Sequence, residues 1–373
     1  MAIEDVDIKE ENIAKFNKGK ILKELLTDHT RRQMLRGQKG HEEDEAYIIW
    51  ATDDYFNSYE EKEGDAEKGI TKESYAFDKP ISPELILGEH EYTITPRIAK
   101  SKTEQERRTK DKAEVFTPSW VCNAQNNLID EAWFGRKNVF NEEIVREDGT
   151  HWWKTTEGKI EFSDKKGKTW KDYVRDTRME ITCGEAPYLV SRYDTTSGEI
   201  IPVKNRIGLL DRKLRVVSEN TEEVGEWLDM AYYAYQNTYG YEWQGDNLLL
   251  ARESLFYTFI DYFKEKFGKM PNARSLQAVA YIISWNIWQM DGLKYVIPCT
   301  CHDVVTKVDG IQLELFGNTT EEVKEIRKPC EGCAKDLPGC HNGIYCKIRD
   351  WPKFKENNPK CDIEFYKLLY FKQ

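Results

Sequence analysis

The stretch RMEITCGEAPYLVSRYD, residues 178–194, decides the fold of this chain. It reads as a short strand, then a tight Cys183-Gly184 turn, then a helix that starts at Pro187. A glycine-bearing turn between a strand and a helix often holds a ligand, because the first backbone N–H groups of the helix are free to donate. The alternative is a plain strand-to-helix turn that holds nothing. The rest of the sequence has to distinguish the two.

The composition predicts a folded, cytoplasmic protein of roughly two or three domains. The chain has 373 residues, of which 39% are hydrophobic and 12% aromatic, which is enough to build a core. No apolar run reaches the ~18 residues of a membrane helix. The N-terminal sequence MAIEDVDIKEEN lacks the basic-then-apolar pattern of a secretion signal. The net charge of −11 repels a polyanion at long range, so contact with nucleic acid would need a local basic patch.

Three regions follow one another along the chain. Residues 1–96 are expected to form a helical accessory region, because apolar residues recur there at helical spacing. Residues 97–298 are expected to form the central α/β domain, with a hairpin insertion at about 135–178. Lysines and tryptophans interleave in that insertion, which suits nucleic-acid contacts or, equally, the charged edge of a sheet. Residues 299–373 form a Cys-rich segment.

Several elements are expected around the opening stretch. Residues 97–114 are polar and basic, and we interpret them as a solvated linker or as a mobile strap near a phosphate backbone. Thr117 and Pro118 are expected to begin a helix. The buried stripe of that helix is expected to be Trp120, Ala124 and Leu128. A short strand ending near Glu242 and two long helices are expected to follow.

Four short motifs together resemble the cofactor half of the S-adenosylmethionine-dependent DNA methyltransferases, and most closely the adenine-N6 group. They are FTP at 116–118, EITCGEAPY at 180–188, YGYEWQ at 239–244 and NIWQMDGL at 286–293. The chain looks similar to methylase subunits of bacterial restriction–modification systems. This resemblance implies an α/β fold with a Rossmann-like methyltransferase sheet that binds S-adenosylmethionine at the carboxyl ends of parallel strands.

The resemblance assigns a role to residues of each motif. Glu180 would meet the amino group of the cofactor or an ordered water. Glu242 would accept hydrogen bonds from both ribose hydroxyls, because a carboxylate offers two oxygens to two adjacent donors. Trp243 would lie against the adenine ring, Asp291 would accept from its exocyclic amine, and FTP would close the pocket over the methionine moiety. The full set expected to bind the cofactor is Phe116, Thr117, Pro118, Glu180, Cys183, Gly184, Glu185, Glu242, Trp243 and Asp291.

The glycine turn departs from the family pattern of an acid, a proline and two glycines. Ile181 and Thr182 stand where the proline would be, and Ala186 replaces the second glycine. Each motif also has a simpler reading. Glu242 would then be an exposed acid beside a core tryptophan, and Asp291 would begin an Asp-Gly turn at the end of a strand.

The catalytic element of the adenine-N6 family is not found in the sequence. That element is Asn or Asp, two prolines and an aromatic residue, which accept hydrogen bonds from the target amine and stack on the flipped-out base. The best substitutes after residue 291 are Asp350 and Trp351, in RDWPKF, but this segment has no Pro-Pro pair. The sheet is therefore expected to be incomplete in this chain, or to be completed by another chain.

The cysteines cluster near the C-terminal end, which in a cytosolic protein favours a metal site over disulfides. The pattern C-x2-C-x6-C-x5-C predicts a structural zinc site. Its expected ligands are Cys330, Cys333, Cys340 and Cys346. Residues that could replace one of these ligands are Cys299, Cys301 and His302. An iron–sulfur cluster and unliganded thiols remain as alternatives.

Three functions stay open on the sequence alone. The first is adenine-N6 methylation of DNA in a restriction–modification or phage-defence system. The second is a non-catalytic subunit that binds cofactor or DNA through a degenerate methyltransferase site. Methylation of RNA or protein is the third. The expected partners are double-stranded DNA and either a second subunit that completes the enzyme or a cognate endonuclease, and no membrane partner is expected.

Overall fold

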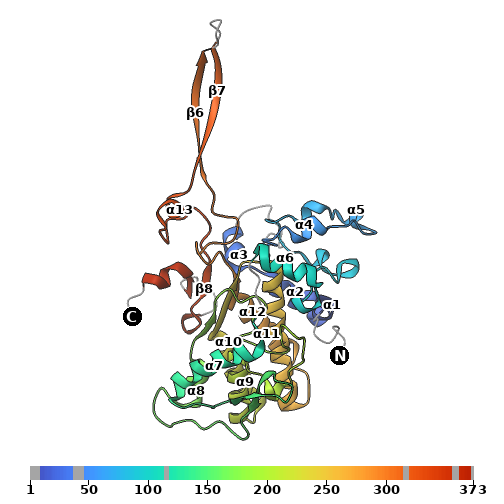
Figure 1. The fold of residues 1–373 in the computed structure, drawn as a ribbon, viewed down its shortest axis with the longest axis vertical. Coiled ribbons are helices and arrows are strands. Elements are labelled where there is room, and N and C mark those ends of the chain that lie inside the picture. The colour runs from blue at the N-terminus through green and yellow to red at the C-terminus, as the bar shows by residue number, and fades with distance from the viewer. Residues whose placement is uncertain (1–8, 37–45, 113–116, 314–318, 355–360, 371–373) are drawn as a thin grey trace. The chain divides into compact units, whose positions relative to one another are not determined.

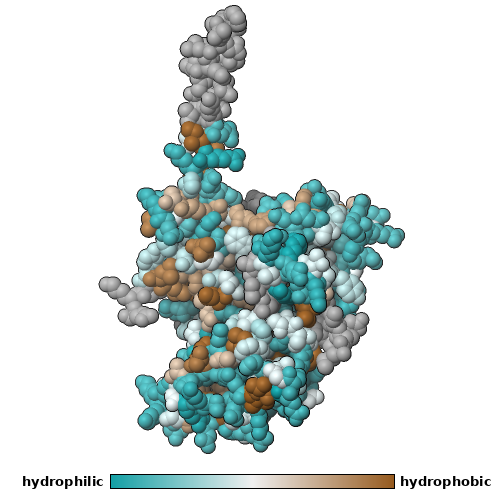
Figure 2. All heavy atoms as spheres, viewed as in Figure 1, coloured by the Kyte–Doolittle hydropathy of each residue, from teal (hydrophilic) through white to brown (hydrophobic). Residues whose placement is uncertain are grey.

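The computed structural model describes residues 9–36, 46–112, 117–313, 319–354 and 361–370 (Figure 1). The fold is mixed α/β with small sheets, and it divides into two units, Met1–Gln289 and Met290–Gln373. None of the helices in these ranges combines the length and hydropathy needed to cross a bilayer. In the view of Figure 2, hydrophilic residues prevail on the surface and hydrophobic ones occur singly or in small groups, as on most protein surfaces.

The first unit opens with short helices and then alternates strands with longer helices. The N-terminal helices are α1 (Glu10–Ala14), α2 (Lys20–Leu26), α3 (His29–Leu35), α4 (Asp54–Ser58) and α5 (Asp65–Lys68). The central elements are α6 (Lys102–Lys112), α7 (Ser119–Phe134), β1 (Asn141–Val145), β2 (His151–Thr155), α8 (Trp170–Arg175), β3 (Arg178–Glu180), α9 (Leu209–Asn220), α10 (Val224–Gln236), β4 (Thr238–Glu242), α11 (Gly245–Phe267), α12 (Ala273–Asn286) and β5 (Ile287–Gln289).

The main sheet of this unit is parallel, with the strand order β3-β4-β5. Helices α9 and α10 connect β3 to β4, and α11 and α12 connect β4 to β5. Because the strands are parallel, their carboxyl ends meet at one edge: Glu180 lies opposite Gly240, and Glu242 lies opposite Gln289. The acids that the sequence placed at two strand ends are therefore neighbours at this edge.

The N-terminal region is bound to the carboxyl end of β5 through the side chain of Gln289. The amide of Gln289 donates from Nε2 to the carbonyl oxygen of Ile49 and accepts from its backbone N–H through Oε1, both at 2.8 Å. Nε2 also donates to the carbonyl oxygen of Trp243 at 2.8 Å. An amide that both donates and accepts in this way imitates the pairing of a strand. Residues 46–51 are thus tied to the same edge as the two acids.

The opening stretch contains the expected strand and turn but not the expected helix. After β3, turns run to Leu189, and the next helix is α9, which begins at Leu209. After the turn at Ala186, which has φ +61°, the carbonyl oxygens of Tyr188 and Leu189 accept from the N–H groups of Leu209 and Leu210 at 2.8 and 2.9 Å, so they are not available to pair within a helix. The expectation of a helix start at Pro187 is therefore wrong.

Residues 102–112 form helix α6 rather than a solvated linker, and Arg108 on this helix is fully buried. Its Nη1 donates to Asp54 Oδ2 and its Nη2 donates to Asp246 Oδ2, each at 2.8 Å. The buried guanidinium thus ties α6 to α4 and to the first turn of α11. Asp246 is also held by the hydroxyl of Tyr55, which donates to Oδ2 at 2.8 Å.

Helix α7 buries a polar face instead of the expected apolar stripe. Trp120 is 38% and Leu128 64% exposed. The buried residues of the helix are Ser119, Cys122, Asn123, Asn126 and Asp130. Two of them contact Arg212 of α9, a buried arginine that donates to Asp130 Oδ2 at 2.5 Å. Asn123 Oδ1 accepts from the same guanidinium at 2.8 Å. Hydrophobic spacing predicts the wrong face here because a buried cation recruits polar partners.

The second unit consists of short elements and one long hairpin. These are β6 (Val304–Leu313), β7 (Thr319–Lys328), α13 (Glu331–Lys335), β8 (Lys347–Arg349) and β9 (Asp362–Glu364). Strands β6 and β7 pair antiparallel over their whole length. Figure 1 shows this pair as a ribbon that extends away from α13 and β8 of the same unit.

Candidate functional site

The carboxyl end of β3 carries a buried acid with an unsatisfied oxygen. Glu180 is only 9% exposed, and its Oε1 accepts a long hydrogen bond of 3.5 Å from the backbone N–H of Tyr188. Its Oε2 is buried and has no hydrogen-bond partner among the described residues. Burial raises the pKa of Glu180 well above the ordinary value, and the nearby charge of Glu242 acts in the same direction. A buried carboxyl oxygen without a partner makes this strand end a candidate ligand site, and the oxygens of Asp211 and Asp246 that share this feature lie elsewhere in the fold.

The turn after β3 brings its backbone close to β4. The N–H of Cys183 donates to the carbonyl oxygen of Tyr241 at 2.9 Å, so pairing with β4 continues past the end of the strand. Gly184 has φ +53°, which glycine adopts freely, and Thr182 has φ +48°, which costs free energy. Gly240 leaves room for this turn, since an added Cβ there would lie 3.3 Å from the thiol of Cys183.

Glu242, at the end of β4, bridges the two loops at the sheet edge. Its Oε2 accepts from the N–H of Gly184 at 2.9 Å. Its Oε1 accepts from the N–H groups of Trp243 at 2.9 Å and Gln244 at 3.2 Å. Burial raises the pKa of Glu242, and these three N–H groups oppose the rise. Because two carboxylate oxygens have about four acceptor positions, this side chain keeps little capacity for a further donor.

Two other expected cofactor residues make structural contacts. The indole N–H of Trp243 donates to the carbonyl oxygen of Ala51 at 3.0 Å. Glu185 is buried, and its oxygens accept from the N–H of Arg97 at 2.7 Å and from the hydroxyl of Tyr193 at 2.6 Å. Both carboxylate oxygens of Glu185 therefore already accept hydrogen bonds from the protein itself.

The segment before α7 also lies at this edge. Phe116 falls outside the described residues. The carbonyl oxygen of Thr117 accepts from the hydroxyl of Thr195 at 3.1 Å, and Pro118 is the N-cap of α7. Burial raises the pKa of the Cys122 thiol, and the charges of Glu180 and Asp194 add to the rise, so the first turn of α7 lies within electrostatic reach of Glu180.

The remaining candidates belong to the second unit. Asp291 makes a turn in which its Oδ1 accepts from the N–H groups of Leu293 at 2.9 Å and Lys294 at 3.1 Å. Asp350 pairs with Lys353 at 2.7 Å. Trp351 is 9% exposed. A tryptophan buried in this way offers no open face on which a flipped-out base could stack.

A group of metal-ligating side chains lies in the second unit. The donor atoms of Cys301, Cys330, Cys333 and His341 all lie within 4.8 Å of one another, so this group could bind a metal ion. The Sγ atom of Cys301 is 3.5 Å from that of Cys330 and 3.6 Å from that of Cys333. The Nδ1 atom of His341 is 3.5–3.8 Å from the three sulfurs. A tetrahedral zinc ion with Zn–S bonds of ~2.3 Å spaces its sulfur ligands ~3.8 Å apart, which is close to these distances.

Local sequence explains why these four residues meet. Cys330 is the N-cap of α13, and its sulfur accepts from the N–H of Cys333 at 3.5 Å. Gly332 permits the close approach of His341, because an added Cβ would lie 2.6 Å from the backbone nitrogen of that histidine. Burial alone would raise the pKa of Cys330, but backbone N–H groups and the contacts with Cys301 and His341 lower it to about 6. Burial and the neighbouring Cys330 and Cys333 raise the pKa of the Cys301 thiol, so Cys330 loses its proton before Cys301 does.

The ligand set expected from the sequence needs correction. Cys330 and Cys333 belong to the group, but Cys340 and Cys346 do not. Cys346 instead lies in backbone pairing, where its N–H donates to the carbonyl oxygen of Tyr295 and its carbonyl oxygen accepts from the N–H of Phe365. Cys301 was one of the named replacements, whereas His341 was missed. The C-x2-C-x7-H spacing that ends at His341 could have identified it.

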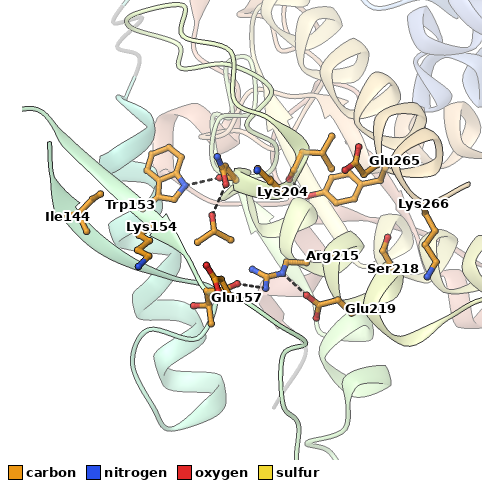
Figure 3. A pocket seen from close by; sticks show the side chains of 15 residues that line it. Ile144, Trp153, Lys154, Glu157, Lys204, Arg215, Ser218, Glu219, Glu265 and Lys266 are labelled. Carbon is orange, nitrogen blue, oxygen red and sulfur yellow. Dashed lines mark hydrogen bonds and ion pairs between the residues drawn. The ribbon is translucent and has the colours of Figure 1, made fainter. Parts of the chain in front are cut away.

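A separate cavity of about 700 Å³ lies in the first unit, between β2, α9 and α11 (Figure 3). Lys154 and Lys204 line it and are exposed, and Arg215 donates from Nη2 to the carbonyl oxygen of Thr156 at 2.8 Å. The ring of Trp153 is buried against the core of the unit. The side chains of Lys154 and Lys204 therefore face solvent, and the ring of Trp153 forms part of the wall of the cavity.

Comparison of the chain with protein-family models, with curated proteins and with solved structures gave no match. Any statement about function therefore rests on the geometry described above.

Proposed function

We propose that the first unit binds S-adenosylmethionine at the carboxyl ends of β3, β4 and β5, and that this cytoplasmic protein methylates adenine N6 in DNA within a restriction–modification or phage-defence system. Three parallel strands in consecutive order, joined by helical connections, support this proposal because they correspond to half of a doubly wound sheet. Ligands of such sheets bind outside the carboxyl ends of the strands.

The observation that carries the proposal is the unsatisfied carboxyl of Glu180 at this edge. The cofactor has an ammonium group and a sulfonium centre, both positively charged. A cation placed against Glu180 would compensate the buried charge and lower the pKa of that acid. Glu242, with three backbone donors, would hold the two loops in position and offer its remaining acceptor capacity to a ribose hydroxyl.

In the proposed reaction the lone pair of adenine N6 attacks the methyl carbon of the cofactor. The N–C bond would form as the S–C bond breaks, S-adenosylhomocysteine would leave as the neutral thioether, and N6 would lose one proton to solvent. The chain has no Asn/Asp-Pro-Pro-aromatic element to restrain the amine, and Trp351 is buried. These two facts favour a second candidate, a subunit that binds cofactor while another chain supplies the catalytic element.

Isothermal titration with S-adenosylmethionine tests cofactor binding. We expect heat with the wild type and at least tenfold weaker binding in Glu180→Gln and Glu242→Gln, because each variant removes a charge at the site. Glu265→Gln changes an exposed acid of α11 and serves as the control. Absence of binding to the wild type, or equal affinity in all variants, refutes the proposal.

Transfer of a tritiated methyl group to DNA separates the two candidates. Labelling by the chain alone supports a complete enzyme. Labelling that requires a second chain supports the subunit, and cofactor binding without labelling in either case excludes catalysis.

DNA as the partner is supported by two exposed lysines at the cavity in Figure 3, although Glu157, Glu219 and Glu265 also line it. Lys154 and Lys204 are exposed there, on the hairpin insertion and on the turn at 203–205. If each contacts one phosphate, replacement by alanine lowers the slope of log affinity against log salt by about 1 per lysine. An unchanged slope in the double variant would place the DNA elsewhere.

For the second unit we propose that the ion is Zn²⁺ with a structural role. Three thiolates and an imidazole form a closed tetrahedral set, which is typical of structural zinc. An iron–sulfur cluster usually takes four cysteines, and a cluster of several irons needs a wider cage than donor atoms within 4.8 Å.

A further inference from the structure

The ligands of the metal group flank the hairpin. Cys301 lies just before β6, which begins at Val304, and Cys330 lies just after β7, which ends at Lys328. Their sulfurs are 3.5 Å apart. The two chain segments that enter and leave the hairpin are therefore held together at its base by the side chains that could bind the ion.

Asn342 holds both backbone groups of His302 at the base of the hairpin, at 3.0 and 2.7 Å, but the described side chains of the strands themselves add little. Val304, Val305 and Ile326 are 49%, 46% and 43% exposed, so these apolar side chains are not buried in a core. The cross-strand pair of Lys307 and Glu325 is 4.0 Å apart with both side chains well exposed, and such pairs contribute little. An isolated two-stranded hairpin is marginal in water even when its ladder is complete.

We propose that the metal ion acts as a clasp that keeps β6 and β7 paired. This inference rests on the zinc proposal. An ion bound by Cys301 on one side and by Cys330, Cys333 and His341 on the other closes the loop formed by the hairpin. Closing that loop removes conformational freedom from the unpaired chain and so favours the paired state. The first unit contains none of these ligands, so we expect its stability not to depend on the ion.

Hydrogen exchange of the full chain, together with measured zinc content, tests the clasp. We expect one zinc per chain, and we expect amides of 304–313 and 319–328 to exchange at least tenfold faster after chelation or in Cys301→Ser. Amides of β4 and α11 should keep their rates. Cys340→Ser is the matched control, because Cys340 is exposed and adjacent to His341 but lies outside the ligand group.

Replacing one metal-binding residue by another distinguishes loss of the metal from a general loss of folding. Cys333→His keeps a donor at this position, so it should retain zinc and hairpin protection while Cys333→Ser loses both. Zinc that binds and leaves without any change in exchange refutes the clasp and leaves the zinc proposal intact. Absence of zinc from the purified chain, with no uptake on addition, refutes both. None of these outcomes bears on binding of S-adenosylmethionine to the first unit.

Discussion

Arg107 and Arg108 are adjacent and both pair with Asp54, yet we expect their replacement to have different effects. Arg107 contacts Asp54 Oδ1 at 2.6 Å with a side chain that is 44% exposed. Arg108 contacts Asp54 and Asp246 at 2.8 Å each and is fully buried. Arg108→Met leaves the buried Asp246 without its cationic partner and removes one of the two arginines that hold Asp54, so it should lower the free energy of unfolding by about 3–5 kcal/mol. Arg107→Met should cost at most about 1 kcal/mol, because Arg107 is already partly solvated and Asp54 keeps its pair with Arg108.

Urea unfolding followed by circular dichroism measures both changes. Replacing Asp246 as well, in Arg108→Met/Asp246→Leu, should recover part of the loss, because a buried pair costs least when both charges are removed together. Although burial opposes it, Arg108 lowers the pKa of Asp246, so this contribution is present at neutral pH and declines as the pH falls below the ordinary value of 3.8. Equal losses in the two arginine variants, or no recovery in the double variant, would refute the reasoning.

Three further predictions address other parts of the first unit. Burial lowers the pKa of His29 from 6.5 to about 4, so the folded state binds fewer protons than the unfolded state in this window. Stability should therefore fall by up to about 3 kcal/mol from pH 7 to pH 4, and His29→Gln should remove that part of the slope, as measured by unfolding at several pH values. Gly245→Ala should destabilise by about 1–3 kcal/mol, because the new Cβ would lie 2.1 Å from a backbone carbonyl oxygen, whereas Gly225→Ala, with open space around it, should stabilise by up to about 1 kcal/mol. Glu180→Gln should raise the melting temperature of the cofactor-free protein at neutral pH, since the raised pKa of this acid means that ionisation opposes folding there. An unchanged or lower melting temperature would contradict the description of Glu180 as a buried acid with an unsatisfied oxygen.

The sequence predicts the elements of the first unit best where apolar residues are dense. The strand ending at Glu242 and the two helices after it occur as expected, because α11 and α12 are buried over most of their surface and their pattern is unambiguous. The turns after Cys183 could not be predicted, because the spacing of apolar residues does not reveal that Ala186 adopts a φ of +61°. The inward face of α7 could not be found either, because a distant arginine, Arg212, selects it.

The candidate sites show the same limit. Spacing along the chain identified Cys330 and Cys333, which are close in sequence. Cys301 is brought to them by the pairing of β6 with β7, a long-range contact that no local motif encodes. The two acids at the sheet edge were found because each ends a strand. That Glu185 uses both oxygens within the fold depends on Arg97 and Tyr193, and only the folded chain shows it.

The contacts of Gln289 have a practical consequence for anyone who wishes to isolate the parallel sheet as a smaller fragment. A chain shortened to begin after residue 96 would strip this side chain of both its partners on Ile49. It would also remove the carbonyl oxygens of Leu25 and Thr27, which accept from Nη1 of the buried Arg252 on α11 at 2.5 and 3.0 Å. Buried donors and acceptors left without partners cost free energy, so we expect such a fragment to be less stable than the intact chain, and its ligand affinity would not describe the intact chain.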